Sequence, residues 1–145
     1  MDIPEIIPKE WGPSAWTFMH YVALKYPMNP TEEDKKHYFI FYHNLQFILP
    51  CPRCAEHYQK NLLELPIQAA LENNKTLFKW TVDMHNRVNK DLGKNEVKYE
   101  DALNMYINSD INSSYDIYIK LSAGVIILLA IYFMDKKYNL FSRFK

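Results

Sequence analysis

The sequence has 145 residues, of which 48% are hydrophobic and 15% aromatic, enough for one packed domain with a short additional segment. Its 17 basic residues balance its 17 acidic residues, so no overall charge would attract a nucleic acid, and we expect no nucleic-acid partner. The three glycines, Gly12, Gly93 and Gly124, lie too far apart for a G-x-G-x-x-G loop. A bound nucleotide would therefore have to be held by side chains.

The first two predicted helices are marked by prolines and by a cap. Residues 12–14, Gly-Pro-Ser, open the first helix with the proline in its first turn, and Tyr26-Pro27 closes it. Trp16 and His20 then share one face of that helix. The second helix starts at residues 31–34, where a threonine N-cap is followed by acidic residues, and it continues as an amphipathic pattern up to the next proline.

The third and fourth helices follow the same rules. The third begins at Cys51-Pro52-Arg53-Cys54 and is interrupted at Pro66, and the fourth runs from about Thr76 to Leu92 with Gly93 as its C-terminal cap. A short fifth helix is predicted at Tyr99–Ile107. Because no alternating strand pattern occurs between these segments, the sequence predicts an all-α fold, a four-helix bundle with a short fifth helix.

The C-terminal third changes character. Residues 108–116 are polar and are predicted to form a linker, whereas residues 117–134 are apolar apart from Lys120 and a few hydroxyl groups. As a helix this segment would span roughly 27 Å, close to the ~30 Å of a bilayer interior, which predicts a transmembrane anchor followed by a basic tail at 135–145. A buried or interfacial helix is the alternative, because the uncharged core is short.

The two cysteines, Cys51 and Cys54, form a single C-x-x-C. The N-terminus shows no secretory signal, so we expect a reducing compartment, where an isolated pair is more often catalytic or metal-binding than structural. At a helix N-terminus the dipole and the neighbouring Arg53 favour the thiolate, which predicts a reversible dithiol. A zinc site that also uses His57 and His85 is the alternative. These residues leave the electron acceptor open.

Three motifs in the sequence together resemble those of a known protein family. They read W-G-P-S-A-W-T-F-M-H at 11–20, C-P-R-C-A-E-H-Y at 51–58 and H-N-R-V-N-K-D-L-G-K at 85–94. In this order the chain resembles the Erv/ALR family of FAD-linked sulfhydryl oxidases, and most of all the compact members encoded by large cytoplasmic DNA viruses. The resemblance covers residues 7–99 and implies that residues 1–107 form an FAD-binding sulfhydryl oxidase domain.

The resemblance also implies roles for individual residues. Cys51 and Cys54 would be the catalytic pair that forms disulfide bonds in protein substrates, with O₂ reduced to H₂O₂. The residues that would bind FAD are Trp11, Gly12, Trp16, His20, Tyr58, Trp80, His85, Asn86, Asn89 and Lys94. Without the motifs, the aromatic residues and the histidines would be interpreted as ordinary core.

Two positions depart from the family pattern. Many members carry a structural disulfide at the positions that read Val82 and Tyr99 here, so packing and bound cofactor would have to replace that disulfide. The chain also has no cysteine pair besides Cys51 and Cys54, which predicts a separate small dithiol protein as relay. The resemblance further implies a homodimer.

Two rival hypotheses and the location of the protein complete the expectations. The rivals are the zinc-binding helical adaptor with Cys51, Cys54, His57 and His85, and a membrane-tethered scaffold without chemistry.

The predicted anchor places the chain at a membrane, with the catalytic domain in the cytosol, and the viral resemblance adds the virion membrane. The basic tail alone would favour a cytoplasmic C-terminus by the positive-inside rule, so the topology stays open.

Overall fold

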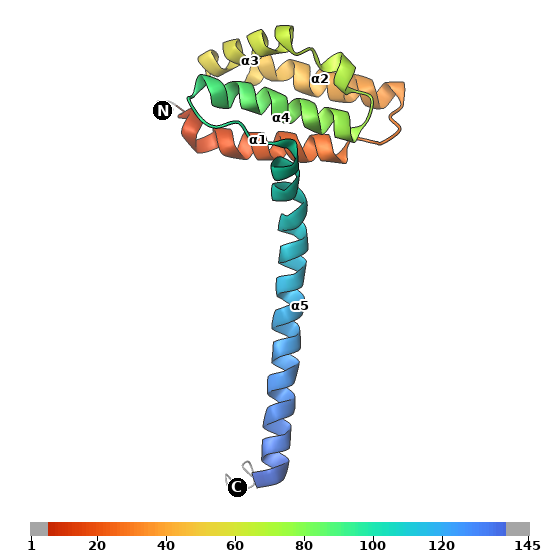
Figure 1. Cartoon of the computed structure of the whole chain (residues 1–145), viewed down its shortest axis with the longest axis vertical. Coiled ribbons are helices and arrows are strands. Elements are labelled where there is room, and N and C mark those ends of the chain that lie inside the picture. The colour runs from red at the N-terminus through yellow and green to blue at the C-terminus, as the bar shows by residue number, and fades with distance from the viewer. Residues whose placement is uncertain (1–5, 139–145) are drawn as a thin grey trace, which may run out of the picture. The chain divides into compact units, whose positions relative to one another are not determined.

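The computed structural model describes residues 6–138, and also their side chains except at 108–117, 135, 137 and 138. Its elements are α1 (Pro8–Lys25), α2 (Glu32–Ile48), α3 (Pro52–Glu64), the 3₁₀ helix η1 (Ile67–Ala70), α4 (Asn74–Asp91) and α5 (Tyr99–Tyr138). Over the described range every regular element is helical, which confirms the predicted all-α class (Figure 1). Met1–Ala102 and Leu103–Lys145 form separate compact units.

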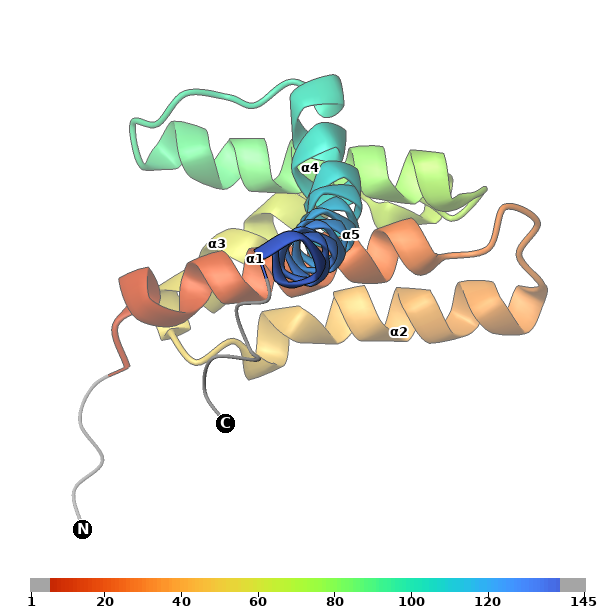
Figure 2. The same cartoon turned by 90° about the horizontal axis from the view of Figure 1, so that it is seen from below.

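The first unit is an up-and-down bundle of α1 to α4. α1 packs along α4, and α2 packs along α3, while η1 closes the connection from α3 to α4 and contacts α2 and α4. As Figure 2 shows, the beginnings of α1 and α3 and the ends of α2 and α4 lie at one end of the bundle. Residues from the start of α1, the start of α3 and the end of α4 are therefore gathered at this end.

Side-chain caps explain where two of the helices begin. At α2, Thr31 accepts a hydrogen bond from the backbone N–H of Asp34 at 3.1 Å, and the Asp34 carboxylate accepts one from the N–H of Thr31 at 2.9 Å. Asn73 caps α4 in a similar way. Such reciprocal caps satisfy donors that the first helical turn leaves without partners. Gly93 follows α4 with φ +68°, which confirms the predicted glycine cap.

The first helix begins earlier than expected. Pro8 occupies its first turn, and Pro13 lies inside the helix. The sequence predicts Pro13 in the first turn, but Pro8, five residues earlier, takes that position. As a result Gly12, which the sequence predicts at the start of the helix, lies inside it, and Trp11 is helical as well.

Buried aromatic side chains form much of the core, and each of their polar ends has a partner. Tyr42 donates to the carbonyl of Met19 at 2.8 Å, and Tyr58 donates to the carbonyl of Tyr42 at 3.0 Å. The indole of Trp80 donates to the carbonyl of Leu65 at 2.9 Å. These bonds connect neighbouring helices and leave the buried hydroxyl and indole groups satisfied.

The fifth helix differs from the prediction. It does not end near Ile107 but continues to Tyr138, through the segment 108–116 that was predicted to be a linker. No glycine or proline occurs between Lys98 and Ala123, so no strong helix breaker stops it, and the polar side chains of 108–116, from which the linker is predicted, are not sufficient to end a helix.

In the described part of the chain, no helix has the length and apolar character needed to cross a membrane. The prediction of a transmembrane helix at 117–134 is thus not supported. The uncharged run Leu121–Met134 would extend roughly 21 Å as a helix, which is shorter than the ~30 Å of a bilayer interior. The predicted basic tail at 135–145 lies mostly outside the described residues.

Candidate active site

The two cysteines form a disulfide at the start of α3. Cys51 is the N-cap, with an extended backbone, and Pro52 begins the helix, so the Cys54 sulfur comes back over the first turn with a Cα to Cα distance of 5.1 Å. The backbone N–H of Cys54 donates to the Sγ of Cys51 at 3.2 Å. This donor and the helix dipole would stabilise a negative charge on Cys51 when the disulfide opens. Both residues are partly exposed.

A second cluster joins α1 to α4. The indole of Trp16 stacks on the imidazole of His85, with ring centroids 4.2 Å apart and planes inclined by 3°. His20, one turn after Trp16, lies with its Nε2 3.2 Å from the Nδ1 of His85. The structure therefore brings together three of the predicted residues, Trp16, His20 and His85, from segments far apart in the sequence. We call these three residues the ring cluster.

Both histidines of this cluster are neutral at neutral pH. Burial lowers the pKa of His20 to about 4, with the neighbouring His85 as the second cause. Burial also lowers the pKa of His85 to about 4, and the positive charge of Lys94 adds to this effect. Because an uncharged imidazole can donate and accept one hydrogen bond each, the cluster offers flat faces and directional polar groups to a ligand.

Three further predicted residues have surroundings that differ from those of the ring cluster. Gly12 has open space where a Cβ would project, and the indole Nε1 of Trp11 is buried without a hydrogen-bond partner among the described residues. Asn89 is buried, and its backbone carbonyl accepts a hydrogen bond from the backbone N–H of Lys94 at 2.8 Å. Trp11 therefore presents an unused donor that a ligand could satisfy.

Three predicted residues serve contacts within the protein. The side-chain amide of Asn86 donates to the carbonyl of Val97 at 2.9 Å and accepts from the N–H of Val97 at 2.9 Å. Tyr58 and Trp80 use their polar atoms on the carbonyls of Tyr42 and Leu65. The structure does not bring these three residues to the ring cluster.

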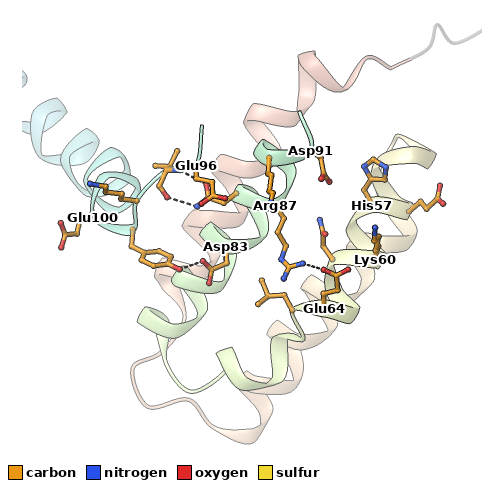
Figure 3. Close-up of a pocket in the computed structure, with 16 residues that line it drawn as sticks. His57, Lys60, Glu64, Asp83, Arg87, Asp91, Glu96 and Glu100 are labelled. Carbon is orange, nitrogen blue, oxygen red and sulfur yellow. Dashed lines mark hydrogen bonds and ion pairs between the residues drawn. The ribbon is translucent and has the colours of Figure 1, made fainter. Parts of the chain in front are cut away.

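A cleft of about 1480 Å³ lies beside α3 and α4, and the segment 96–100 lines it as well. Figure 3 shows that His57, Lys60 and Glu64 line it from α3, and that Asp83, Arg87 and Asp91 do so from α4. An ion pair of 2.5 Å joins Arg87 to Glu64. Asn61, which also lines the cleft, is 7% exposed, and its Nδ2 has no hydrogen-bond partner in the described part of the chain.

The arrangement can hold a flat, polar cofactor and does not favour a metal. The stacked Trp16 and His85 rings offer flat faces to an aromatic ligand. Trp11, and in the cleft Asn61, each have a buried donor that acceptor atoms of a ligand could satisfy. The ring residues are not among those that line the cleft. No group of three or more His, Cys, Asp and Glu side chains that could hold a metal ion occurs among the described residues. The cysteine sulfurs are bonded to each other, so the zinc alternative is not favoured.

Two residues of the site were missed by the sequence analysis. Thr81 lies one turn before His85 and contacts His20, and a search along the face of α4 that carries His85 would have found it. Asn61 lies two turns after Cys54 on α3, beyond the end of the motif at 51–58. Its importance comes from packing, which leaves its amide buried beside the cleft, and no pattern in the sequence indicates this.

Comparisons with known proteins agree with this site. The model of the Erv1 / Alr family matches residues 13–108. A mimivirus protein from Acanthamoeba polyphaga mimivirus, named "Probable FAD-linked sulfhydryl oxidase R368", is 43% identical over 97 residues, which are 66% of this chain and 68% of the relative. The "Mitochondrial FAD-linked sulfhydryl oxidase ERV1" of Saccharomyces cerevisiae is 35% identical over 94 residues, 65% of this chain and 48% of the yeast protein.

A solved structure gives the same result for the fold. The crystal structure of the yeast Erv1 core superposes with a TM-score of 0.65 and 30% sequence identity, covering 74% of this chain and 87% of the yeast one. The matched region contains the disulfide and the ring cluster, so both belong to the part of the chain that resembles these relatives.

Proposed function

Because the chain belongs to the Erv1/Alr family, we propose that it is an FAD-linked sulfhydryl oxidase that makes disulfide bonds in other proteins. The Cys51–Cys54 disulfide, placed at the N-terminus of α3 in this bundle, carries the proposal. The overall reaction is 2 R–SH + O₂ → R–S–S–R + H₂O₂, in which the substrate thiols are oxidised and oxygen is reduced.

The protein's own part in the reaction is thiol–disulfide exchange. A substrate thiolate attacks the Sγ of Cys51, a new S–S bond forms, and the bond to Cys54 breaks with Cys54 leaving as a thiolate. A second substrate thiolate then attacks the substrate sulfur and releases Cys51 as a thiolate. The N–H of Cys54 that points at this sulfur favours its release.

Several residues fit the FAD cofactor. The Trp16 and His85 rings offer stacking faces, and the unpartnered donors of Trp11 and Asn61 suit its many acceptor oxygens and nitrogens. When bound, FAD would supply the two-electron acceptor that restores the Cys51–Cys54 disulfide and passes these electrons to O₂. The residues of the bundle orient it by side chains, as the absence of a glycine-rich loop in the sequence requires.

Purification of the full chain from cells supplied with riboflavin tests the proposed activity. We expect a yellow protein with a flavin spectrum that consumes O₂ when dithiothreitol is added and produces one H₂O₂ per dithiothreitol oxidised. A colourless protein that shows no oxygen consumption after incubation with FAD would contradict the proposal.

A small dithiol protein is the partner that suits this chain. The sequence offers only Cys51 and Cys54, so within it no second cysteine pair can carry electrons from a client. The disulfide lies at a partly exposed bundle end, where a thiol must dock closely to reach Cys51. A compact dithiol relay meets this requirement better than a folded client with buried cysteines.

The oxidase acts as a homodimer in this proposal. Large apolar side chains are exposed on the bundle, among them Phe18 on α1 and Ile40, Phe47 and Ile48 on α2. A second copy would remove such groups from water. Sedimentation of the purified full chain at twice the monomer mass is the expected result, and a monomer at micromolar concentration would contradict it.

We place the protein at a membrane, with the oxidase bundle on the cytosolic side or, in a virus, at the virion membrane. Residues 118–134 of α5 are all exposed and almost all apolar, and Lys120 is their only charged member. A bilayer, even if entered only in part, would cover this surface. Attachment would also hold the oxidase and its relay at one surface and raise their encounter rate.

A further inference from the structure

A chain of hydrogen bonds runs from the backbone of α4 through α1 and back to α4. The hydroxyl of Thr81 donates to the carbonyl of Phe78 at 2.7 Å. The same hydroxyl oxygen lies 2.9 Å from the Nδ1 of His20, and the Nε2 of His20 lies 3.2 Å from the Nδ1 of His85. Phe78, Thr81 and His20 are buried and His85 is half-buried, so the contacts of Thr81 are shielded from bulk water and the chain ends at the partly accessible His85.

The first contact in the chain has only one direction. A carbonyl oxygen cannot donate, so the short contact with Phe78 uses the single proton of the Thr81 hydroxyl. If that proton pointed to His20 instead, two oxygen atoms 2.7 Å apart would face each other without a proton between them. The Thr81 oxygen therefore accepts from His20, and His20 carries its proton on Nδ1.

This direction determines the tautomer of the second histidine. A neutral imidazole has one N–H, and burial keeps the pKa of both His20 and His85 near 4, so both are neutral at pH 7. With its proton on Nδ1, His20 can only accept at Nε2, and the Nδ1 of His85 must donate to it. The Nε2 of His85 is then left without a proton, as a hydrogen-bond acceptor.

We propose that Thr81 is a positioning residue that acts through His20 and holds His85 in the tautomer whose Nε2 accepts a hydrogen bond from the bound flavin nucleotide. The proposal rests on the proposed binding of FAD. An unprotonated, neutral Nε2 selects a donor on the ligand, an exocyclic amine, an imide N–H or a hydroxyl, and it disfavours phosphate oxygens, which can only accept. Thr81 thus contributes to orientation of the cofactor without a contact to it.

The direct test is the ¹⁵N NMR signature of the imidazole nitrogens in full-length protein labelled at histidine, with and without FAD. We expect protonated Nδ1 and unprotonated Nε2 at both His20 and His85 in the wild type at pH 7. His85 protonated at Nε2 would overturn the proposal. This measurement does not depend on activity or on a variant that folds.

Two variants separate the positioning role from packing. Thr81→Val keeps the shape of the side chain but removes the hydroxyl, and Thr81→Ser keeps the hydroxyl but removes a methyl group. We expect Thr81→Val to lose the wild-type tautomer pattern and to bind FAD about tenfold more weakly, the effect of one hydrogen bond, while Thr81→Ser retains both properties. If Thr81→Val binds FAD as tightly as the wild type, or if Thr81→Ser loses the tautomer pattern, the proposal is wrong. Failure of the wild type itself to bind FAD would instead contradict the proposed function.

Discussion

At the scale of single residues, the chain separates redox chemistry from cofactor binding. Cys51 and Cys54 are held by the first turn of α3, whereas the ring cluster of Trp16, His20 and His85 belongs to α1 and α4. Substitution of either cysteine should therefore leave the ring cluster intact. The cluster depends instead on burial, which keeps its two histidines uncharged.

This burial predicts a dependence of stability on pH. The folded protein holds the pKa of His20 and His85 at about 4, below the ordinary histidine value of 6.5 that applies in the unfolded chain. Between these values the unfolded chain binds protons that the folded chain does not, so stability is fully present above about pH 6.5 and is lost as the pH falls toward 4. We expect the melting temperature measured from pH 8 to pH 4 to follow this course.

A matched pair of variants assigns the effect. His20→Gln should reduce the slope of melting temperature against pH between about 4.5 and 6.5, because one of the two buried histidines is gone. Asn44→Gln, which changes an exposed and non-titrating side chain on α2, should leave the slope unchanged. Equal slopes for the wild type and His20→Gln would show that the buried histidine does not cause it.

At the scale of elements, a set of noncovalent contacts holds the segment after α4 where many relatives would have a disulfide. Asn86 pairs with the backbone of Val97 through two hydrogen bonds. Tyr99 donates to the carboxylate of Asp83, and the Lys79 ammonium lies 5.0 Å from the centre of the Tyr99 ring. Together these contacts fix residues 97–99 against α4 without a covalent bond.

Asn86→Ala tests the strongest of these contacts. The variant leaves both the N–H and the carbonyl of Val97 without their side-chain partner, and we expect a loss of roughly 1–3 kcal/mol in the free energy of unfolding together with faster hydrogen exchange at Val97. Asn44→Ala, at an exposed position on α2, is the control and should change neither quantity. Unaltered exchange at Val97 in Asn86→Ala would mean that the other contacts suffice.

The proposed membrane attachment depends on α5 and has its own prediction. The apolar side chains of residues 118–134 are exposed, so the full-length protein should stay in the membrane pellet after alkaline carbonate extraction. Replacement of two of them by Ile127→Lys and Leu128→Lys should move it into the supernatant, and the conservative Lys120→Arg should not. Release of the wild type by carbonate would contradict insertion of this helix into the bilayer and would show a peripheral helix instead.

At the scale of the whole molecule, the sequence predicted most of the bundle but less of its site. A threonine cap marked the start of α2, a proline marked the start of α3, and Gly93 marked the end of α4, because local rules decide these boundaries. The same rules did not decide the start of α1, where two prolines compete, or the length of α5, where no breaker occurs. The motifs led to Trp16, His20 and His85, and a search along the same face of α4 would have added Thr81. Asn61 acquires its place beside the cleft only when α3 and α4 pack together.

The relay hypothesis also belongs to the whole molecule, since it concerns what the oxidase meets in the cell. In a Cys54→Ser variant expressed in the native host, the Cys51 thiolate should attack the disulfide of an oxidised partner, whose second sulfur leaves as a thiolate. The resulting mixed disulfide should accumulate, because the Cys54 thiol that would attack Cys51 and release the partner is missing. We expect mass spectrometry to identify one dominant small protein with a C-x-x-C pair. A broad set of unrelated final clients, with no dominant small dithiol protein, would argue for direct oxidation.

The most direct test of the central claim is an anaerobic titration of the FAD-loaded full chain with dithiothreitol. We expect the wild type to take up two electron pairs, one that reduces the Cys51–Cys54 disulfide and one that reduces the flavin and bleaches its absorbance. When O₂ is readmitted, the protein should release H₂O₂. The double variant Cys51→Ser, Cys54→Ser should bind FAD and keep its colour under the same titration. If the flavin of the double variant bleaches as fast as that of the wild type, electrons reach it without the cysteine pair, and the proposed function is wrong.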